Sequence, residues 1–228
     1  MMWTSTLLVG PALCLAGVAA ASETSAILSA MDAAAAGFVS VRAHIEKASY
    51  TAVIQDTTVE SGQFRMSRGG RGREVRMRVE IAEPDARTIV FAGRKGEIYY
   101  PKIQTVHEYD LGRHKAVVDS FLLLGFGTSG KALAKDYTIR YGGAETVNGV
   151  AADRLELTPK AAKTRERFSR VELWVAREGA YPVQQKFHAP GGDTTTITYT
   201  NIEWNVALSE KDLTLALPAG VKRELPQR

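Results

Sequence analysis

"EVRMRVEIAEP", residues 74–84, alternates charged and apolar side chains from Glu74 to Ile81. In an extended chain Val75, Met77, Val79 and Ile81 point to one side, and the charged residues between them point to the other. This period of two predicts a β-strand with one dry face and one solvated face. The stretch therefore predicts an antiparallel sheet that covers an apolar interior.

The same alternation recurs along most of the chain after residue 37. It is found in residues 62–68, 137–141, 154–157, 170–175, 193–202 and 212–218. Turn signals separate these runs at Ser61-Gly62, Gly69-Gly70, Ala92-Gly93, Asn148-Gly149, Glu178-Gly179 and 190–192. We predict about eleven antiparallel strands in a mainly β domain over residues 22–228, curled into a barrel or a strongly bent sheet. Charged outward faces and helical segments argue against a barrel that spans an outer membrane.

Two segments break the strand pattern. "TSAILSAMDAAAAGF", residues 24–38, has apolar residues at helical spacing and predicts a lid helix over about 24–37, with Thr24 or Ser25 as N-cap and Gly37 as its end. A second helical region is predicted over about 113–135. It contains "VVDSFLLLGFGTSG", residues 117–130, which is either a buried core helix or a mobile lid over an apolar cavity. Its glycines weaken a helix where movement would be needed, which favours the lid.

The N-terminus is typical of a secretory signal peptide. "LLVGPALCLAGVAAAS", residues 7–22, is an apolar run that ends in small residues, with Ala19 and Ala21 placed for cleavage before Ser22. We therefore expect residues 1–21 to be removed on export. Cleavage would remove Cys14, the one cysteine, and so would exclude disulfides and thiol chemistry from the mature chain.

Signals for catalysis are missing from the sequence. The four histidines, His44, His107, His114 and His188, lack the spacing of metal ligands. There is no nucleophile elbow, zinc-protease motif or phosphate-binding loop. The net charge of +4 is too mild to indicate nucleic acid. We expect no catalytic residue, no metal and no cofactor.

Several stretches in order carry a resemblance to a known family. They are "GFVSVRAHIE", "SGQFRMSRG", "EPDARTIVFAGRKGEIYYP", "LTPK", "RVELWVAREGAYPVQQKF" and "LTLALPAGV". With them the chain resembles the outer-membrane lipoprotein carrier (LolA-like) family over nearly its whole mature length. The resemblance implies a periplasmic, unclosed antiparallel barrel with a helical lid that carries acyl chains and performs no chemistry. It also implies an inner-membrane ABC-type releasing complex and an outer-membrane acceptor as partners, with transient membrane contact by a monomer.

The strand pattern and the resemblance together give candidate binding residues. We expect one face of the strands to line an acyl cavity, and the apolar run at 117–130 to form its lid. The predicted wall is Phe64, Met66, Val75, Met77, Val79, Ile98, Leu173, Phe187 and Tyr199, and the predicted lid residues are Phe121, Leu122, Leu124 and Phe126. The resemblance adds Arg68 as a latch that holds the lid, although a solvated turn charge would also explain it.

Some features leave alternatives open. Residues 68–78 contain five arginines, which indicate a solvated hairpin, a contact with anionic lipid head groups or an acidic partner surface. The same fold could also serve as the lipid-sensing, interacting domain of an envelope-stress regulator. A lipocalin-like binder of small apolar molecules is a third interpretation.

Overall fold

A computed structural model describes residues 15–69, 74–113 and 126–226. The helices are α1 (Leu15–Ala36), η1 (Pro101–Ile103), η2 (Leu111–Arg113), α3 (Gly130–Asp136), α4 (Ala162–Arg165) and η3 (Glu210–Leu213). The strands are β1 (Ser40–Thr51), β2 (Asp56–Gly69), β3 (Glu74–Glu83), β4 (Arg87–Ala92), β5 (Lys95–Tyr100), β6 (Thr105–Asp110), β7 (Tyr137–Val147), β8 (Val150–Pro159), β9 (Arg170–Ala176), β10 (Pro182–His188), β11 (Thr194–Trp204) and β12 (Lys222–Glu224).

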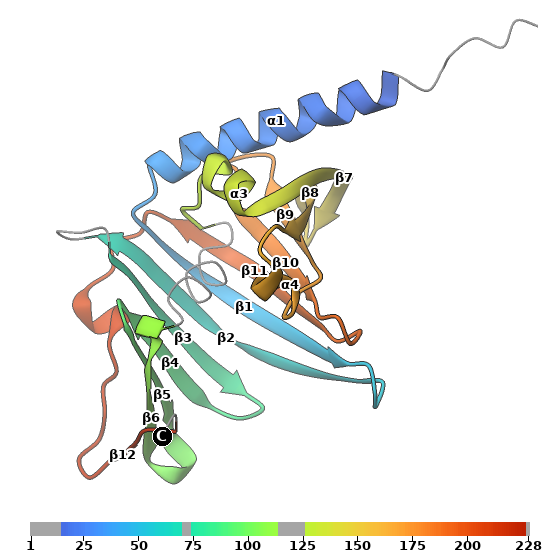
Figure 1. Cartoon of the computed structure of the whole chain (residues 1–228). Helices are drawn as coiled ribbons and strands as arrows, with labels where there is room; N and C mark the ends of the chain where they lie inside the picture. Colours follow the sequence, from blue (N-terminus) through green and yellow to red (C-terminus); the bar gives the residue numbers. More distant parts are fainter. Residues whose placement is uncertain (1–14, 70–73, 114–125, 227–228) are drawn as a thin grey trace, which may run out of the picture.

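These strands form one sheet in the order β12-β6-β5-β4-β3-β2-β1-β11-β10-β9-β8-β7. Two antiparallel meanders, β1–β6 and β7–β11, are joined where β1 pairs with β11. The strands β7 and β12 lie at opposite edges of the sheet, so the barrel is not closed (Figure 1). The predicted mainly β, unclosed barrel is confirmed. The sheet has twelve strands rather than about eleven, and the short β12 adds to β6 in parallel. The alternating run 212–218 is not one of the strands, because it begins in η3 and continues as irregular chain.

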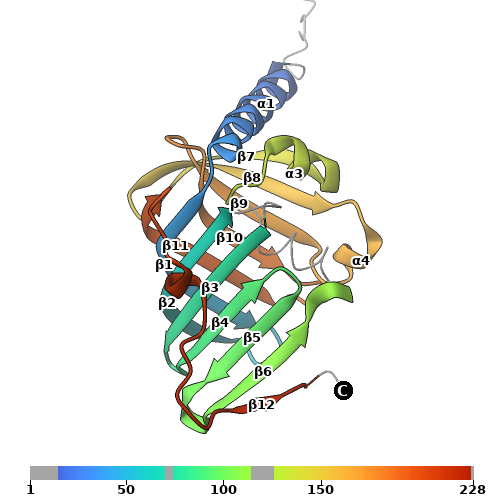
Figure 2. The same ribbon diagram turned by 90° about the vertical axis from the view of Figure 1, so that its left-hand side faces the viewer.

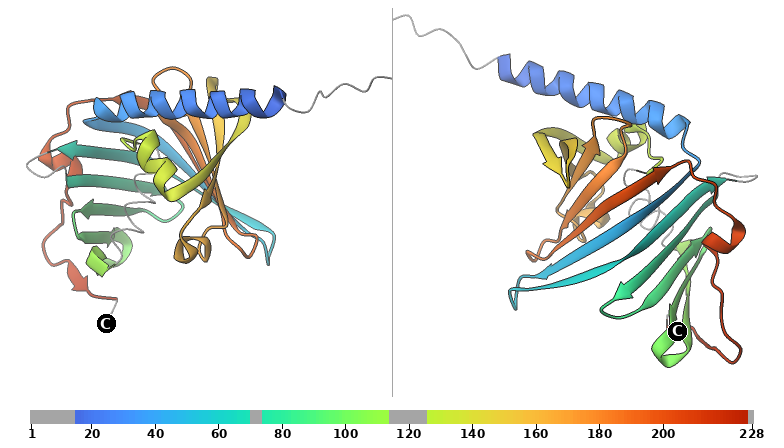
Figure 3. Two further views of the ribbon diagram at one scale, coloured as in Figure 1. Left: turned by 45° about the horizontal axis from the view of Figure 1, so that its top comes forward. Right: turned by 180° about the vertical axis from the view of Figure 1, so that it is seen from behind.

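The sheet curls, so that its two flanks rise on either side of a floor formed by β1, β2 and β11 (Figures 1 and 3). Cross-strand partners share one face of a sheet. The row Leu155, Leu173, Gln185, Ile197 and Lys47 follows this pairing from β8 to β1 and marks the inner face. The alternation read from the sequence therefore divides each strand into an inner and an outer set of side chains.

Helix α1 lies across one end of the sheet with α3 beside it, near β7 and β8 (Figure 2). Met31 of α1 and Leu133 of α3 are almost fully buried against Leu155, Leu157 and Leu173 on the inner face. Burying such side chains is favourable by about 1.5–3 kcal/mol each. This part of the interior is thus filled by the protein itself.

Helix α1 departs from the prediction at its N-terminal end. Helix α1 ends at Ala36, next to the predicted stop at Gly37, but it is already formed at Leu15. Thr24 and Ser25 are inside the helix and are not its N-cap; the Thr24 Oγ1 donates to the Ala20 carbonyl at 2.9 Å. The alanine-rich residues before Thr24 favour helix and extend it.

The second predicted helical region is described only at its two ends. The turn of 3₁₀ helix η2 lies before it, and α3 covers Gly130–Asp136. Ser129 caps α3 by accepting a hydrogen bond from the Ala132 backbone N–H at 3.1 Å. Residues 114–125, which include most of the predicted lid, lie outside the described residues.

One predicted turn is a strand irregularity instead. Ser61-Gly62 lies within β2, where the pairing with β3 shifts register. A Cβ atom at Gly62 would lie 1.9 Å from the Glu80 carbonyl oxygen, so only glycine allows this approach. The chain reverses earlier, between Thr51 and Asp56. The extra residue of this β-bulge is Ala82 of β3, and Gly62 lies opposite it; the glycine thus marks a close approach of two strands and not a turn.

The outer face carries a buried carboxylate on β9. Glu172 is 6% exposed; the Arg154 Nη1 donates to it at 2.7 Å, and the His188 Nε2 lies 2.8 Å from it. Burial opposes ionisation of Glu172, but the hydrogen bonds from His188 and Arg154 outweigh it and hold its pKa below the ordinary value of 4.5. The ionised carboxylate therefore ties β8, β9 and β10 together.

Glu172→Gln is expected to lower the free energy of unfolding at neutral pH by about 1–3 kcal/mol. Because the pKa of Glu172 is depressed in the folded state, its contribution is complete above the unfolded value and is lost as the pH falls through the folded value. The variant should therefore lose less stability than the wild type below pH 4.5. Urea unfolding at neutral and acid pH measures this, with the exposed Glu46→Gln as control. If the variant and the wild type lost equal amounts of unfolding free energy between neutral and acid pH, Glu172 would not be the stabilising carboxylate.

Candidate functional site

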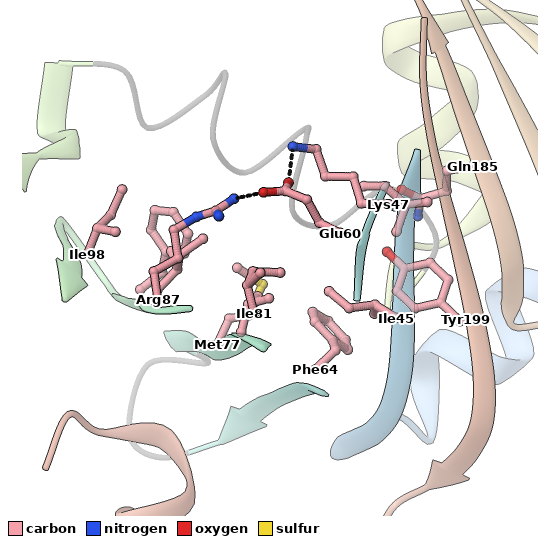
Figure 4. Close-up of a pocket in the computed structure, with 14 residues that line it drawn as sticks. Ile45, Lys47, Glu60, Phe64, Met77, Ile81, Arg87, Ile98, Gln185 and Tyr199 are labelled. Carbon is pink, nitrogen blue, oxygen red and sulfur yellow. Dashed lines mark hydrogen bonds and ion pairs between the residues drawn. The ribbon is translucent and has the colours of Figure 1, made fainter. Parts of the chain in front are cut away.

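A cavity of about 310 Å³ opens on the inner face, between the two flanks of the sheet (Figure 4). Five strands of the first meander, together with β10 and β11, supply its wall. Ten of its fourteen lining residues are apolar. The apolar ones are Ile45, Phe64, Met77, Val79, Ile81, Ile89, Phe91, Ile98, Ile197 and Tyr199, and the polar ones are Lys47, Glu60, Arg87 and Gln185.

Strand register builds the apolar wall. Phe64, Val79, Ile89 and Ile98 are successive cross-strand partners from β2 to β5, so they form one apolar row across the sheet. Neighbouring pairs in such a row stabilise each other by about 0.2–1 kcal/mol. A cavity with this lining suits hydrocarbon better than water, because apolar cavities bind no water firmly.

Phe126 fills one side of this region. It is 1% exposed, and its ring centroid lies 4.9 Å from that of Tyr199 and 5.5 Å from that of Phe64, both of which line the cavity. Burial raises the pKa of Tyr199, so its hydroxyl stays protonated. Phe126 thus packs against the cavity wall from the end of the apolar run predicted as a lid.

Arg68 lies beside this segment. Its guanidinium carbon is 6.0 Å from the centre of the Phe38 ring. A Cβ atom at Gly127 would lie 3.2 Å from the same carbon and 2.4 Å from the Phe38 ring, and Gly127 has a φ of +66°. Glycine therefore lets the chain after Phe126 approach both side chains closely.

The nine residues predicted as cavity wall all lie on the inner face, in three settings. Lining the cavity are Phe64, Met77, Val79, Ile98 and Tyr199. Met66 and Val75 lie in the adjacent apolar cluster, which also contains Phe126. Leu173 and Phe187 do not line the cavity and belong to the neighbouring cluster that contains Met31 of α1. The predicted lid residues Phe121, Leu122 and Leu124 lie outside the described residues.

The sequence interpretation missed a charged group in the cavity wall. Glu60 is 9% exposed and lies between two cations: its Oε2 accepts from the Lys47 Nζ at 2.8 Å, and its Oε1 accepts from the Arg87 Nη2 at 2.5 Å. Burial opposes ionisation of Glu60, but the hydrogen bonds from Lys47 and Arg87 outweigh it and lower its pKa. The alternation could have revealed all three, since each continues the inner face of its strand.

The arginine-rich segment is partly tied to the chain's own C-terminal part. Arg76 forms a bidentate ion pair with Glu210, and the Arg78 Nη1 donates to the Thr214 carbonyl at 2.8 Å. These two arginines therefore hold η3 against β3. Arg71 and Arg73 lie outside the described residues.

Two negative findings apply to residues 15–69, 74–113 and 126–226. In these ranges, no three His, Cys, Asp or Glu side chains are grouped as a metal site requires. The helices of these ranges also lack the combination of length and apolarity that a bilayer span needs.

Solved structures share the fold at low sequence identity. An uncharacterised conserved protein from Thermus thermophilus matches with a TM-score of 0.57 and 12% identity over 89% of this chain and 99% of that one. MucB in the MucA/MucB complex of Pseudomonas aeruginosa matches with a TM-score of 0.52 and 17% identity, over 85% of this chain and 61% of that one. LprF from Mycobacterium bovis matches with a TM-score of 0.51 and 13% identity, over 87% of this chain and 99% of that one. This chain therefore spans about three fifths of MucB.

The family assignment rests on the sequence. None of the curated proteins matches the chain. The family described as outer membrane lipoprotein carrier protein LolA matches residues 47–215, which begin in β1 and include every cavity-lining residue except Ile45. With most of its length matched and the open, curled sheet in place, the chain belongs to the LolA family of outer membrane lipoprotein carrier proteins.

Proposed function

We propose that the protein is a periplasmic carrier that shields the acyl chains of lipoproteins, or of related lipids, and moves them from the inner to the outer membrane. The observation that supports this most is the cavity on the inner face, with its ten apolar lining residues. Family membership supports the same role. In this proposal the chain carries out no chemistry, and its residues bind and release hydrocarbon.

Release limits how tightly the cavity should hold its cargo. Transfer of hydrocarbon out of water is favourable by about 0.8 kcal/mol for each methylene, so a long acyl chain would leave a perfectly fitting cavity very slowly. Phe126 already packs against two of the lining residues. An incoming acyl chain that displaces its ring must replace those contacts, which reduces the net affinity and helps release.

Export is part of the proposal. Cleavage before Ser22 would remove only the first two turns of α1 and leave Met31, which is almost fully buried against the sheet. The mature chain, residues 22–228, would then keep α1 over β7 and β8. A releasing complex of the ABC type in the inner membrane and an acceptor in the outer membrane are the partners that family membership suggests, with the carrier acting as a monomer.

A release assay tests the carrier role. Inner-membrane vesicles from the source organism, holding palmitate-labelled lipoprotein, are incubated with ATP and the purified mature chain. We expect labelled lipoprotein to leave the vesicles and to elute with the chain as a soluble complex. Lipoprotein that stays in the vesicles under these conditions would refute carriage.

Arg68 is proposed as the latch of the lid. Its guanidinium lies near Phe38 and beside Gly127, which belongs to the predicted lid segment 117–130. A hydrogen bond from a guanidinium to a backbone carbonyl of the lid, as the family resemblance implies, would be worth about 1.5–3 kcal/mol. Arg68→Gln should therefore raise the exchange rate of a bound fluorescent acyl lipid about tenfold or more, measured by stopped flow. Arg42→Gln, on the outer face, is the control, and equal rates in both variants would exclude a latch.

A lipid-sensing regulatory domain is the second candidate. Its basis is the shared fold with MucB, which has been solved together with MucA. Affinity purification from the envelope separates the two roles: recovery of a membrane transporter complex supports carriage, and recovery of a regulator supports sensing. A single small apolar ligand in native mass spectra, without lipid, would favour the lipocalin-like alternative.

A further inference from the structure

The cavity is apolar on one side and charged on the other. Figure 4 shows Lys47 and Arg87 reaching Glu60 from opposite directions, above the apolar side chains of Met77 and Phe64. The three charged residues come from β1, β2 and β4, which places them on one edge of the apolar row. An acyl chain lying on that row would bring its head group close to them.

The charged side of the cavity has an excess of positive charge. Lys47 and Arg87 share a single carboxylate, that of Glu60, so the group carries a net charge of +1 when all three are ionised. Within the described residues, the other acceptor found for Arg87 is the Asp85 carbonyl, at 3.1 Å. An ammonium has three N–H donors and a guanidinium has five, so both cations keep donors for a further acceptor.

The two cations are more exposed to solvent than the carboxylate that they share. The side chain of Lys47 is 35% exposed, that of Arg87 is 18% exposed, and that of Glu60 is 11% exposed. The two cations therefore lie at the solvent side of the cavity, with the carboxylate between them. A head group held there can stay hydrated while its tail lies on the apolar wall, as amphiphiles require.

A purely structural ion pair explains this arrangement less well. Charges on the wall of an apolar cavity carry a desolvation penalty, and well-packed apolar residues in their place are often as stable or more so. One cation would satisfy Glu60, yet two surround it. The geometry points to a head-group site: we propose that the cavity selects acyl lipids with an anionic head group, which Lys47 and Arg87 bind.

This inference rests on the proposed acyl-binding function, and three probes separate the two. They are 1-palmitoylglycerol 3-phosphate, 1-monopalmitoylglycerol, which lacks only the phosphate, and glycerol 3-phosphate, which lacks the tail. Each is titrated calorimetrically below its micelle concentration into the delipidated mature chain. We expect the phosphate-bearing lipid to bind at least about tenfold more tightly than its neutral counterpart, and the free head group to bind weakly.

Single variants test the residues without leaving Glu60 alone. Lys47→Gln and Arg87→Gln each leave it one cation, and each should reduce the preference for phosphate to about threefold or less. Glu60→Gln removes the competing carboxylate and should increase the preference. Arg42→Gln removes a paired cation from the outer face of β1 and should leave the preference for the phosphate-bearing lipid unchanged. The ratio of two affinities is insensitive to a general loss of stability, and thermal unfolding of each variant checks the fold.

The outcomes discriminate clearly. Equal affinity for both palmitoyl lipids would overturn the head-group site and leave the acyl cavity standing. Binding of neither lipid would overturn both proposals. Tight binding of glycerol 3-phosphate alone would overturn the inference in favour of a site for free anions. An unchanged preference in both Lys47→Gln and Arg87→Gln would also overturn it.

Discussion

Ile98→Glu should weaken the binding of a palmitoyl lipid by at least about 100-fold. Ile98 lines the cavity at the end of the apolar row, directly across from Ile89. A bound acyl chain would take water away from the new carboxylate, and this desolvation amounts to several kcal/mol. Since Ile98 is only partly buried, the carboxylate stays hydrated in the free protein and the fold should survive.

Val59→Glu provides the matched control for Ile98→Glu. Val59 is also an apolar, β-branched strand residue, but it is 49% exposed and lies on the outer face of β2. Calorimetric titration with 1-monopalmitoylglycerol gives both affinities, and circular dichroism verifies that each variant is folded. An Ile98→Glu variant that binds the lipid as well as Val59→Glu would show that the acyl chain lies elsewhere.

Strand alternation predicts much of this fold because a period of two is a local property. In β3, Val75, Met77, Val79 and Ile81 all lie on the inner face, as their spacing indicates. The division of the side chains into two faces therefore needed no tertiary information, whereas which of the two faces lines the cavity is known only from the structure. The same rule, carried on into the charged residues, would have placed Lys47 and Glu60 inside, but charged residues are normally expected to be solvated.

Other features depend on long-range contacts that the sequence pattern does not show. Leu173 and Phe187 have the same alternation as Phe64, yet they pack in the cluster that contains Met31 of α1 and do not line the cavity. Which part of the inner face a helix covers is decided by tertiary packing. Strand β12 has only three residues, all charged, and exists because it pairs with β6. Gly62 has the appearance of a turn signal but lies within β2, opposite a bulge in β3, because glycine suits either setting.

The last prediction uses this division of the interior. Phe126→Ala and Phe187→Ala both delete a ring that is 1% exposed, so each should lower the free energy of unfolding by about 3–5 kcal/mol. The two voids differ in place. Phe126 packs against Phe64 and Tyr199 of the cavity wall, whereas Phe187 packs against Phe168 in the cluster that contains Met31 of α1.

An acyl chain can reach one of these voids and not the other. A ligand at about 100 times its Kd adds about 2.7 kcal/mol to the free energy of unfolding. In Phe126→Ala the deleted ring enlarges the lipid cavity, so 1-monopalmitoylglycerol should add more to this variant than it adds to the wild type at the same concentration, because the acyl chain also fills the void. In Phe187→Ala the same lipid should add no more than it adds to the wild type. Urea unfolding of the three proteins with and without lipid measures the difference. Equal recovery in both variants would mean that Phe126 does not border the lipid site, because only a void continuous with the cavity gains contacts when the acyl chain enters.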